Sequence, residues 1–339
     1  MANMKDIANK TGLSLATVSR VFNNSDKVSP KTRNHVLKTA RELNFRPNKM
    51  ASALRSGKSF TIGIVVPFID RHVFSAAIRR MEEVFSAAGY SIIICQSHES
   101  ATKEIEILEN LKQLRIDGVI ISVSEETQSV EPILSMKSSG IPVVLFDRSL
   151  DIDSINSVII HNFNGAYQAT THLIEQNCKR IIHLAGNDSV GIFKERRRGF
   201  EAAMKDHGKE VSPESVLRFD NESEEGVAAL KAQLTSRTPP DGIMAHGDIS
   251  ALQAIRTIQD MGLSIPNDVA IIGFGDSDFC PYTNPGLSSV SQRNEDVGKL
   301  AAQTMLKELQ EKEESVYTQQ MLAPKVIVRG SSKRKGYEK

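Results

Sequence analysis

Apolar residues are spaced differently in two parts of the chain, and the change falls near residue 60. Before it, apolar side chains recur every three or four positions over short stretches, which predicts amphipathic helices. After it, short continuous apolar runs alternate with stretches of helical spacing. That alternation is typical of buried parallel strands connected by helices. The sequence therefore predicts a small α-helical head and a larger α/β body.

Local signals divide the head, residues 1–47, into three short helices. Gly12 interrupts the first apolar pattern, and Ser14 is a suitable N-cap for a second helix. Ser29 and Pro30 form the N-cap and first position of a third. Two helices joined by a tight turn that contains glycine are typical of a helix-turn-helix.

The second helix has two distinct faces when its residues are placed about 100° apart. One arc consists of Leu15, Ala16, Ser19, Arg20 and Asn23, and the other of Thr17, Val18, Val21 and Phe22. The second arc can pack against the head, which leaves the first exposed. Such a helix fits the DNA major groove, where Arg20 can bond guanine and Leu15 or Ala16 can meet thymine methyl groups.

Charge supports this interpretation. Residues 1–58 contain twelve Lys or Arg and three Asp or Glu, a net charge of +9 (twelve minus three), whereas the whole chain is +1. The remaining residues therefore carry −8 (+1 minus +9). A basic head on an acidic body favours a polyanionic partner such as nucleic acid. The alternative is a small three-helix domain with a solvated basic surface and no ligand.

The body resembles repeated strand-helix units. Its apolar runs predict strands at residues 62–66, 92–95, 119–123, 143–146, 158–160, 181–184, 243–245 and 270–273. Helical spacing predicts helices at residues 74–87, 103–114, 165–175, 196–207, 223–234 and 250–261. This length exceeds one typical core, so two similar lobes with parallel sheets are expected.

Polar side chains follow several predicted strands of the body. Open parallel sheets bind ligands at the carboxyl ends of their strands. Each residue taken singly is more readily a helix cap or a surface group, but their shared placement favours a ligand site. Carboxylates, an amide and a guanidinium suit a small polyhydroxylated ligand such as a sugar. The residues expected at this site are Phe74, Asp147, Asn162, Arg196, Asp248 and Asp276.

Enzymatic chemistry is not indicated. No Gly-x-Gly-x-x-Gly motif follows a strand, and no phosphate-binding loop is present. The eight histidines lack metal-ligand spacing, and Cys95, Cys178 and Cys280 are far apart. We therefore expect no catalysis, no cofactor and no metal. We also expect a cytoplasmic protein, because neither a secretory signal nor an apolar run of about twenty residues is found.

Longer motifs give the chain a family resemblance. They are KDIA at residues 5–8, GLS at 12–14, TVSRVFN at 17–23, VSPKTR at 28–33, LNFRPN at 43–48 and ASAL at 51–54. Together they resemble the lactose/galactose repressor family of bacterial regulators, and the likeness extends to about Arg329. The resemblance implies a ligand-gated transcriptional repressor that acts as a homodimer on double-stranded operator DNA.

The segment 48–58 is the next informative piece. Pro47 and Gly57 bound a stretch too short to be a stable helix in isolation, so it reads as an interdomain linker. The resemblance implies instead a hinge helix that forms on the operator, with Leu54 wedged into the minor groove. The residues expected to contact DNA are Lys5, Ser14, Leu15, Ala16, Thr17, Ser19, Arg20, Asn23, Lys27, Ser29, Thr32, Asn48, Ala51, Leu54 and Arg55.

The resemblance also implies a body like a periplasmic sugar-binding protein, whose lobes are joined by three crossings near residues 160, 290 and 320. Residues 59–330 would form this effector-binding and dimerisation domain. Lobe one would take about residues 61–159 and 291–319, and lobe two about 160–290 and 320–330. Residues 331–339 are expected to be a charged, disordered tail.

The match at the effector site is uneven. Asp147 and Arg196 fit the family pattern, but Gly247 stands where an asparagine is usual and Gly275 where an aspartate is usual. Glycine there can admit a bulkier ligand. The missing side chains leave a second hypothesis open, in which the body senses a phosphorylated partner protein rather than a sugar. A third, a periplasmic binding protein, is disfavoured by the basic head.

Overall fold

The computed structural model describes residues 2–23, 28–45, 58–148, 150, 152–219, 224–310 and 317–334, apart from the side chain of Asn23. The expected hinge at residues 48–57 therefore lies outside the described residues. The chain forms two units, residues 1–59 and residues 60–339, which we call the head and the body.

The head consists of α1 (Met4–Thr11), α2 (Leu15–Asn23) and α3 (Pro30–Glu42). Asn3 caps α1 in a capping box with Asp6, and Gly12 ends it with a φ of 67°, a conformation that glycine adopts without strain. The three helices bury one apolar cluster, which includes Ile7, Val18 and Val36. These contacts confirm the predicted three-helix head.

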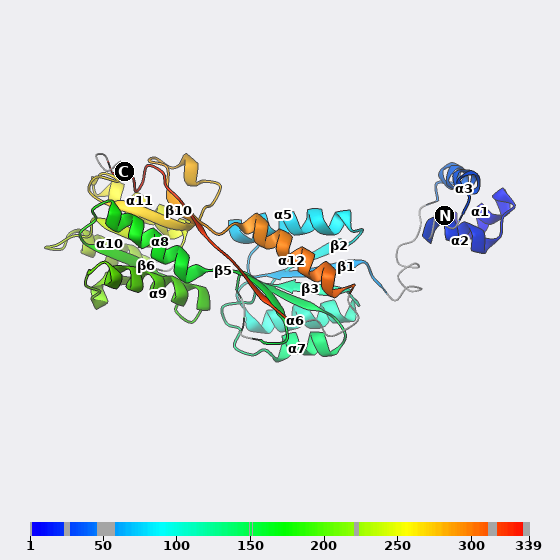
Figure 1. The fold of residues 1–339 in the computed structure, drawn as a ribbon, viewed down its shortest axis with the longest axis horizontal. Coiled ribbons are helices and arrows are strands. Elements are labelled where there is room, and N and C mark those ends of the chain that lie inside the picture. The colour runs from blue at the N-terminus through cyan, green and yellow to red at the C-terminus, as the bar shows by residue number, and fades with distance from the viewer. Residues whose placement is uncertain are drawn as a thin grey trace. The chain divides into compact units, whose positions relative to one another are not determined.

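Lobe one of the body has a parallel sheet in the order β11-β5-β4-β3-β1-β2. Its strands are β1 (Thr61–Val66), β2 (Ser91–Gln96), β3 (Gly118–Ile121), β4 (Val143–Phe146), β5 (Asn156–Ile160) and β11 (Gln319–Leu322). Its helices are α5 (His72–Ala87), α6 (Ala101–Gln113), α7 (Glu131–Ser138) and α12 (Asn294–Glu308). Helices α5 and α12 lie together on one face, and α6 and α7 cover the other (Figure 1).

Lobe two repeats this plan with the order β12-β10-β9-β8-β6-β7, in which only β12 runs antiparallel among the described strands. The strands are β6 (Ile181–Ala185), β7 (Val216–Arg218), β8 (Gly242–Ala245), β9 (Ala270–Gly275), β10 (Ser288–Ser291) and β12 (Lys325–Ile327). The helices are α8 (Asn162–Glu175), α9 (Gly191–Asp206), α10 (Glu224–Leu234) and α11 (Asp248–Asp260), with 3₁₀ turns η2 (Pro213–Ser215) and η3 (Cys280–Tyr282).

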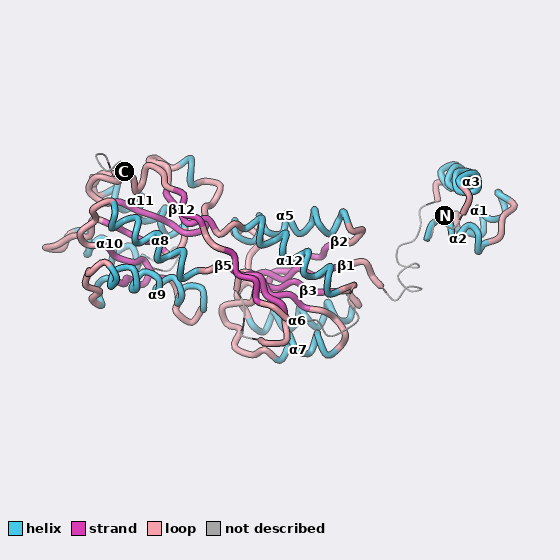
Figure 2. The backbone as a smooth tube through the Cα atoms, viewed as in Figure 1, coloured by secondary structure: helices cyan, strands magenta, loops and turns pink. Residues whose placement is uncertain are grey.

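The described chain crosses between the lobes three times (Figure 2). The crossings lie between β5 and α8, between β10 and α12, and between β11 and β12. They fall near the predicted positions, although β11 pairs with β5 and so extends lobe one to residue 322 rather than 319. Each lobe is therefore assembled from separate parts of the sequence.

The last described residues differ from the expected disordered tail. Ser331 and Ser332 are fully buried against lobe two. The Ser331 hydroxyl donates to the carbonyl of Ile271 over 2.7 Å, and Arg334 donates to the carbonyl of Asp241 over 2.7 Å. Serine hydroxyls allow this segment to be buried because Ser331 Oγ satisfies backbone groups where β9 and β10 begin. The docked chain thus continues through residue 334.

Among the described helices, none combines the length and the apolar character that a bilayer crossing requires.

Candidate DNA-binding surface and effector cleft

Helix α2 presents the surface that its periodicity predicts. Val18 and Val21 are buried in the head, whereas Leu15 is 45% exposed. Ala16 and Arg20 are also exposed, and Ser19 is half-buried. Leu15, Ala16 and Arg20 are thus all accessible to a partner, and a DNA major groove offers both thymine methyl groups and hydrogen-bond acceptors.

Two of the head helices begin with hydroxyl caps. The amide of Thr17 donates to Ser14 Oγ over 3.1 Å at the start of α2, and the amide of Thr32 donates to Ser29 Oγ over 3.3 Å at the start of α3. The hydroxyls of Thr17 and Thr32 hydrogen-bond the same caps at 2.9 Å. Helix N-termini attract anions, so these four residues are suited to phosphate contacts. Lys5 is exposed on α1.

Some of the expected DNA contacts cannot be placed. The side chain of Asn23 and the residues Lys27, Asn48, Ala51, Leu54 and Arg55 lie outside the described residues.

A cleft of about 880 Å³ lies between the two lobes of the body. Residues that follow strands of both sheets line it, among them Glu125 after β3, Asp147 after β4 and His246 after β8. This is the edge at which parallel sheets bind ligands. A second cavity of about 740 Å³ adjoins the cleft, because Glu125 and Asp147 line both.

Asp147 forms part of the lobe-one wall of the cleft. It is 7% exposed and has a left-handed φ of 58°. Its amide donates to the carbonyl of Val158 over 3.1 Å, but its carboxylate makes no hydrogen bond to another described residue. Burial raises the pKa of this carboxyl, and the charges of Arg148 and Arg196 partly oppose that shift. Asp147 is therefore a buried acceptor available to a ligand.

Arg196 on α9 forms part of the opposite wall. Its Nε donates to Asn162 Oδ1 over 2.9 Å, its Nη1 donates to the carbonyl of His246 over 2.5 Å, and its guanidinium stacks 3.7 Å from the ring centroid of Phe274. Burial lowers its pKa to about 10, against the attraction of Asp147, so it stays charged at neutral pH. These contacts fix the guanidinium.

Asn162 and Phe74 were both expected to contact the ligand in the cleft, and the structure gives each of them other contacts. Asn162 lines the adjoining cavity rather than the cleft, and it orients Arg196. Phe74 does line the cleft, but it is only 2% exposed and packs edge-on against Phe146 with 6.2 Å between ring centroids. Most of its surface belongs to the core of lobe one.

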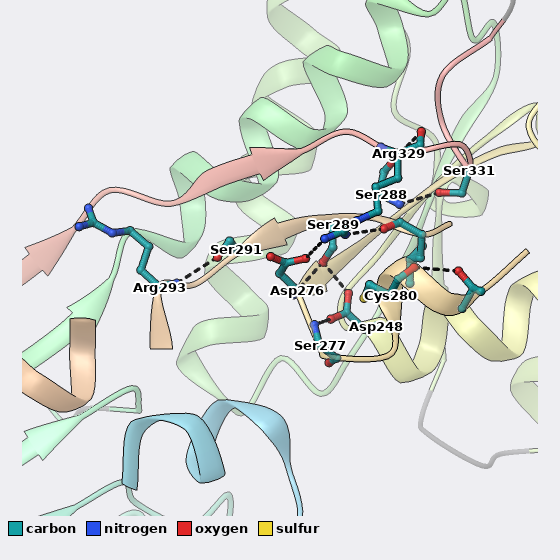
Figure 3. A network of polar contacts seen from close by, with 12 residues as sticks. Asp248, Asp276, Ser277, Cys280, Ser288, Ser289, Ser291, Arg293, Arg329 and Ser331 are labelled. Carbon is teal, nitrogen blue, oxygen red and sulfur yellow. Dashed lines mark hydrogen bonds and ion pairs between the residues drawn. The ribbon is translucent and has the colours of Figure 1, made fainter. Parts of the chain in front are cut away.

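Asp248 is turned into lobe two (Figure 3). Its Oδ2 accepts from the amide of Ser277 over 2.7 Å, and its Oδ1 accepts from the hydroxyl of Ser289 over 2.5 Å. A Cβ at Gly273 would lie 2.4 Å from Oδ1, so glycine is required for this carboxylate position. Both oxygens thus accept hydrogen bonds inside the lobe, while Asp248 also lines the cleft, so its expected role at the ligand stays a prediction.

Asp276, which was expected at the ligand, is paired within lobe two. Its carboxylate pairs with Arg329 over 2.8 Å, and its amide donates to Ser289 Oγ over 3.0 Å (Figure 3). It is not among the residues that line the cleft. The reason is that Arg329, on the chain that follows β12, lies within reach of the loop after β9 and neutralises it there.

Sequence reasoning missed the groups that bridge the lobes. Asn187, after β6, donates its Nδ2 to the carboxylate of Glu125 from lobe one. Glu99 supports Glu125 by accepting from its amide over 2.8 Å and also pairs with Arg148 over 2.7 Å. The signal was available, since each of these residues follows a strand. A second bridge joins His72 of lobe one to Asp278 of lobe two over 3.4 Å.

Within the part of the chain that the structure describes, no three His, Cys, Asp or Glu side chains gather as metal ligands would.

A helix-turn-helix head joined to a two-lobed body with a polar cleft defines the class of ligand-responsive DNA-binding regulators. Residues 3–48 match the model for bacterial regulatory proteins of the lacI family, and residues 170–332 match that for a periplasmic binding protein-like domain. The chain belongs to the lacI family and is a transcriptional regulator rather than an enzyme.

Two named relatives align with this chain over nearly its full length. The HTH-type transcriptional repressor PurR of Haemophilus influenzae (strain PittEE) is 32% identical, over 98% of this chain and 99% of the relative. The ribose operon repressor of Halalkalibacterium halodurans is 33% identical, over 98% of both. The solved complex of the transcriptional regulator CelR with cellobiose has a TM-score of 0.73 at 26% identity and covers 98% of this chain and 100% of that one.

Proposed function

We propose that this protein is a cytoplasmic repressor that binds a two-fold symmetric operator as a homodimer. A small-molecule effector raises or lowers its affinity for the operator. The effector is a carbohydrate or carbohydrate derivative that binds in the cleft between the lobes. Two α2 helices read the half-sites, and Leu15, Ala16 and Arg20 contact the bases.

One observation carries the effector assignment. A buried carboxylate without an internal partner, Asp147, and a buried guanidinium, Arg196, line the same cleft from different lobes. A polyhydroxylated molecule can donate to the first and accept from the second at once. The names of two relatives, a ribose operon repressor and a regulator solved with cellobiose, support a sugar.

The same arrangement couples ligand to DNA. A molecule that bonds both Asp147 and Arg196 favours one angle between the lobes, because these residues belong to different lobes. The bridge from Asn187 to Glu125 favours a particular angle as well. A change of lobe angle at three crossings is a rigid-body switch, and in a homodimer it changes the spacing of the heads.

Two titrations of the full-length protein test the proposal. Calorimetry against ribose, D-xylulose, cellobiose and other sugars should give heat with at least one, and Asp147→Asn should weaken the binding of that sugar by about 10- to 100-fold. Arg20→Ala should weaken specific operator binding by about 10- to 100-fold while sparing nonspecific binding, because one good base contact contributes about 1–3 kcal/mol. Unchanged operator discrimination, or no heat with any sugar, would refute the corresponding assignment.

A further inference from the structure

His246 is a cleft residue whose side chain has no role in the site described so far. It follows β8, lines the cleft next to Gly247, and is 5% exposed. Its backbone carbonyl already holds Arg196. The imidazole therefore sits beside the fixed guanidinium, at the place where lobe two was expected to offer a carboxylate.

The contacts of the imidazole determine which nitrogen carries the proton. Nε2 lies 3.1 Å from the carbonyl oxygen of Phe219 and 2.6 Å from Ser250 Oγ. A carbonyl oxygen can only accept, so Nε2 must donate and carries the hydrogen. In a neutral imidazole the other nitrogen is then an acceptor. Nδ1 is buried and has no hydrogen-bond partner in the described protein.

The ring is neutral at physiological pH. Burial lowers the pKa of His246 to about 3, and the nearby charges of Arg196 and Arg218 and the imidazole of His183 act in the same direction. The lone pair of Nδ1 is therefore not lost to a proton above about pH 4. A buried acceptor without a donor costs about 1–3 kcal/mol. A ligand group that donates a hydrogen bond to Nδ1 would remove this cost.

The surroundings of Nδ1 face the cleft. A Cβ at Gly186 would lie 3.1 Å from Nδ1 and 2.8 Å from the ring of Phe193, so the three groups adjoin. Phe193 packs edge-on against His246 with 4.9 Å between ring centroids. Gly186, Phe193 and His246 all line the cleft. Phe193 belongs to the first turn of α9, so rotation of one side chain uncovers Nδ1.

We propose that His246 determines effector specificity: its Nδ1 accepts a hydrogen bond from a hydroxyl group of a neutral sugar once the Phe193 ring turns aside. This rests on the proposed function, because it names the chemistry of the same effector. Asp248 already accepts hydrogen bonds within lobe two. Lobe two therefore contacts the ligand through the neutral acceptor His246 Nδ1 and the cation Arg196. That pair selects hydroxyl groups and disfavours amino sugars, because an ammonium group would lie near Arg196.

Two substitutions separate the two nitrogens. His246→Gln keeps a donor near the Nε2 position, for Phe219 and Ser250, and removes the acceptor at Nδ1. His246→Asn places an amide oxygen near Nδ1 and removes the Nε2 contact. Calorimetry uses the full-length protein with ribose, D-xylulose, cellobiose and their monodeoxy and amino analogues.

We expect His246→Gln to weaken the best sugar by about 10- to 100-fold, and one monodeoxy analogue of that sugar to bind wild type as weakly. That analogue should bind His246→Gln and wild type alike. His246→Asn should retain more sugar affinity than His246→Gln while being less stable to heat. Unchanged binding by His246→Gln, or equal losses for the sugar and every deoxy analogue, would overturn the role of Nδ1. If wild type binds no sugar at all, the proposed function itself fails.

Two further readouts do not use the His246 variants. The ¹⁵N resonance of Nδ1 in the wild type should move upfield as the sugar is added, since its lone pair becomes an acceptor; a fixed resonance contradicts the proposal. The chain contains no tryptophan, so Phe193→Trp supplies a single tryptophan whose emission can be excited selectively. Its emission should change on sugar binding, and constant emission would refute the movement of that ring.

Discussion

Asp147 and Asp248 both line the cleft, one from each lobe, yet their carboxylates are used in different ways. Each follows a central strand, and they are 7% and 3% exposed. Ser277 and Ser289 bond both oxygens of Asp248, whereas the carboxylate of Asp147 has no hydrogen-bonded partner among the described residues. A carboxylate at a strand end is thus a candidate, and the neighbouring donors decide whether it serves the fold or the ligand.

The largest expected effect is that of pH on the free energy of unfolding. Burial lowers the pKa of two histidines in lobe two and raises the pKa of Asp147 in lobe one. Burial lowers the pKa of His246 to about 3 and that of His183 to about 4. The unfolded chain binds these protons from about pH 6.5 downward and the folded chain does not. Lobe two should therefore lose about 1.4 kcal/mol per pH unit for each histidine as the pH falls below about 6.

Asp147 contributes to the pH dependence of stability with the sign opposite to that of the histidines. Its pKa is raised in the folded state, so its contribution favours folding at low pH and is lost as the pH rises through the folded pKa. Denaturant unfolding at pH 7 and pH 5 measures the balance. The double variant His183→Gln, His246→Gln should flatten the loss on acidification, and an unchanged slope would contradict the assignment to these histidines.

Asp248→Asn should be the more damaging of the two aspartate substitutions to stability. The amide group places a donor against the amide of Ser277 or the hydroxyl of Ser289, and it leaves one of them unpaired. We expect a loss of about 2–3 kcal/mol in the free energy of unfolding. The folded fraction should bind effector as wild type does. A stable variant that has lost effector binding would show that Asp248 contacts the ligand after all.

Asp147→Asn should give the reverse result. Effector affinity should fall by about 10- to 100-fold, because a hydrogen bond to a charged acceptor contributes about 1.5–3 kcal/mol. Stability should be equal or slightly higher, since a neutral amide costs less to bury than a carboxylate. Calorimetry and thermal unfolding on one preparation give both values. Destabilisation without loss of affinity would make Asp147 a structural residue like Asp248.

The smallest effect is expected at the bridge between the lobes. Asn187→Asp sets a carboxylate against that of Glu125 and should disfavour closure of the cleft by about 1 kcal/mol, which calorimetry detects as weaker effector binding. In the double variant Glu125→Gln, Asn187→Asp the amide and the carboxylate exchange places, so the hydrogen bond can re-form. Recovery in the double variant is the expected result, and its absence would mean that the bridge does not control closure.

Much of the fold could be predicted because its elements carry strong patterns. The apolar runs at β1, β4 and β9 and the capped helices of the head are examples. Helix α7 and strands β7, β10 and β11 were missed. Strand β10 contains the fully buried Ser288 and Ser289, which hydrogen-bond rather than pack, so no apolar run marks it. Strand β11 begins with two glutamines at a sheet edge.

The candidate site was predictable only in outline. Strand ends located the cleft and pointed to Asp147, and the family resemblance pointed to Arg196 on a helix. They could not reveal that Arg329, about fifty residues further along the chain, pairs with Asp276, or that Ser289 bonds Asp248. Such pairings depend on which strands become neighbours in space, and spacing along the chain does not contain that information. The tautomer of His246 likewise depends on the carbonyl of Phe219, which follows β7.

The docked segment around Ser331 and Ser332 has a consequence for biosynthesis. Strand β12 and these serines complete lobe two, while α12 and β11 complete lobe one, so a nascent chain lacks part of both lobes until residues 319–332 have left the ribosome. The head needs only its own first residues and can fold long before. A truncated translation product would thus carry a folded basic head on an incomplete body, able to bind DNA without responding to an effector.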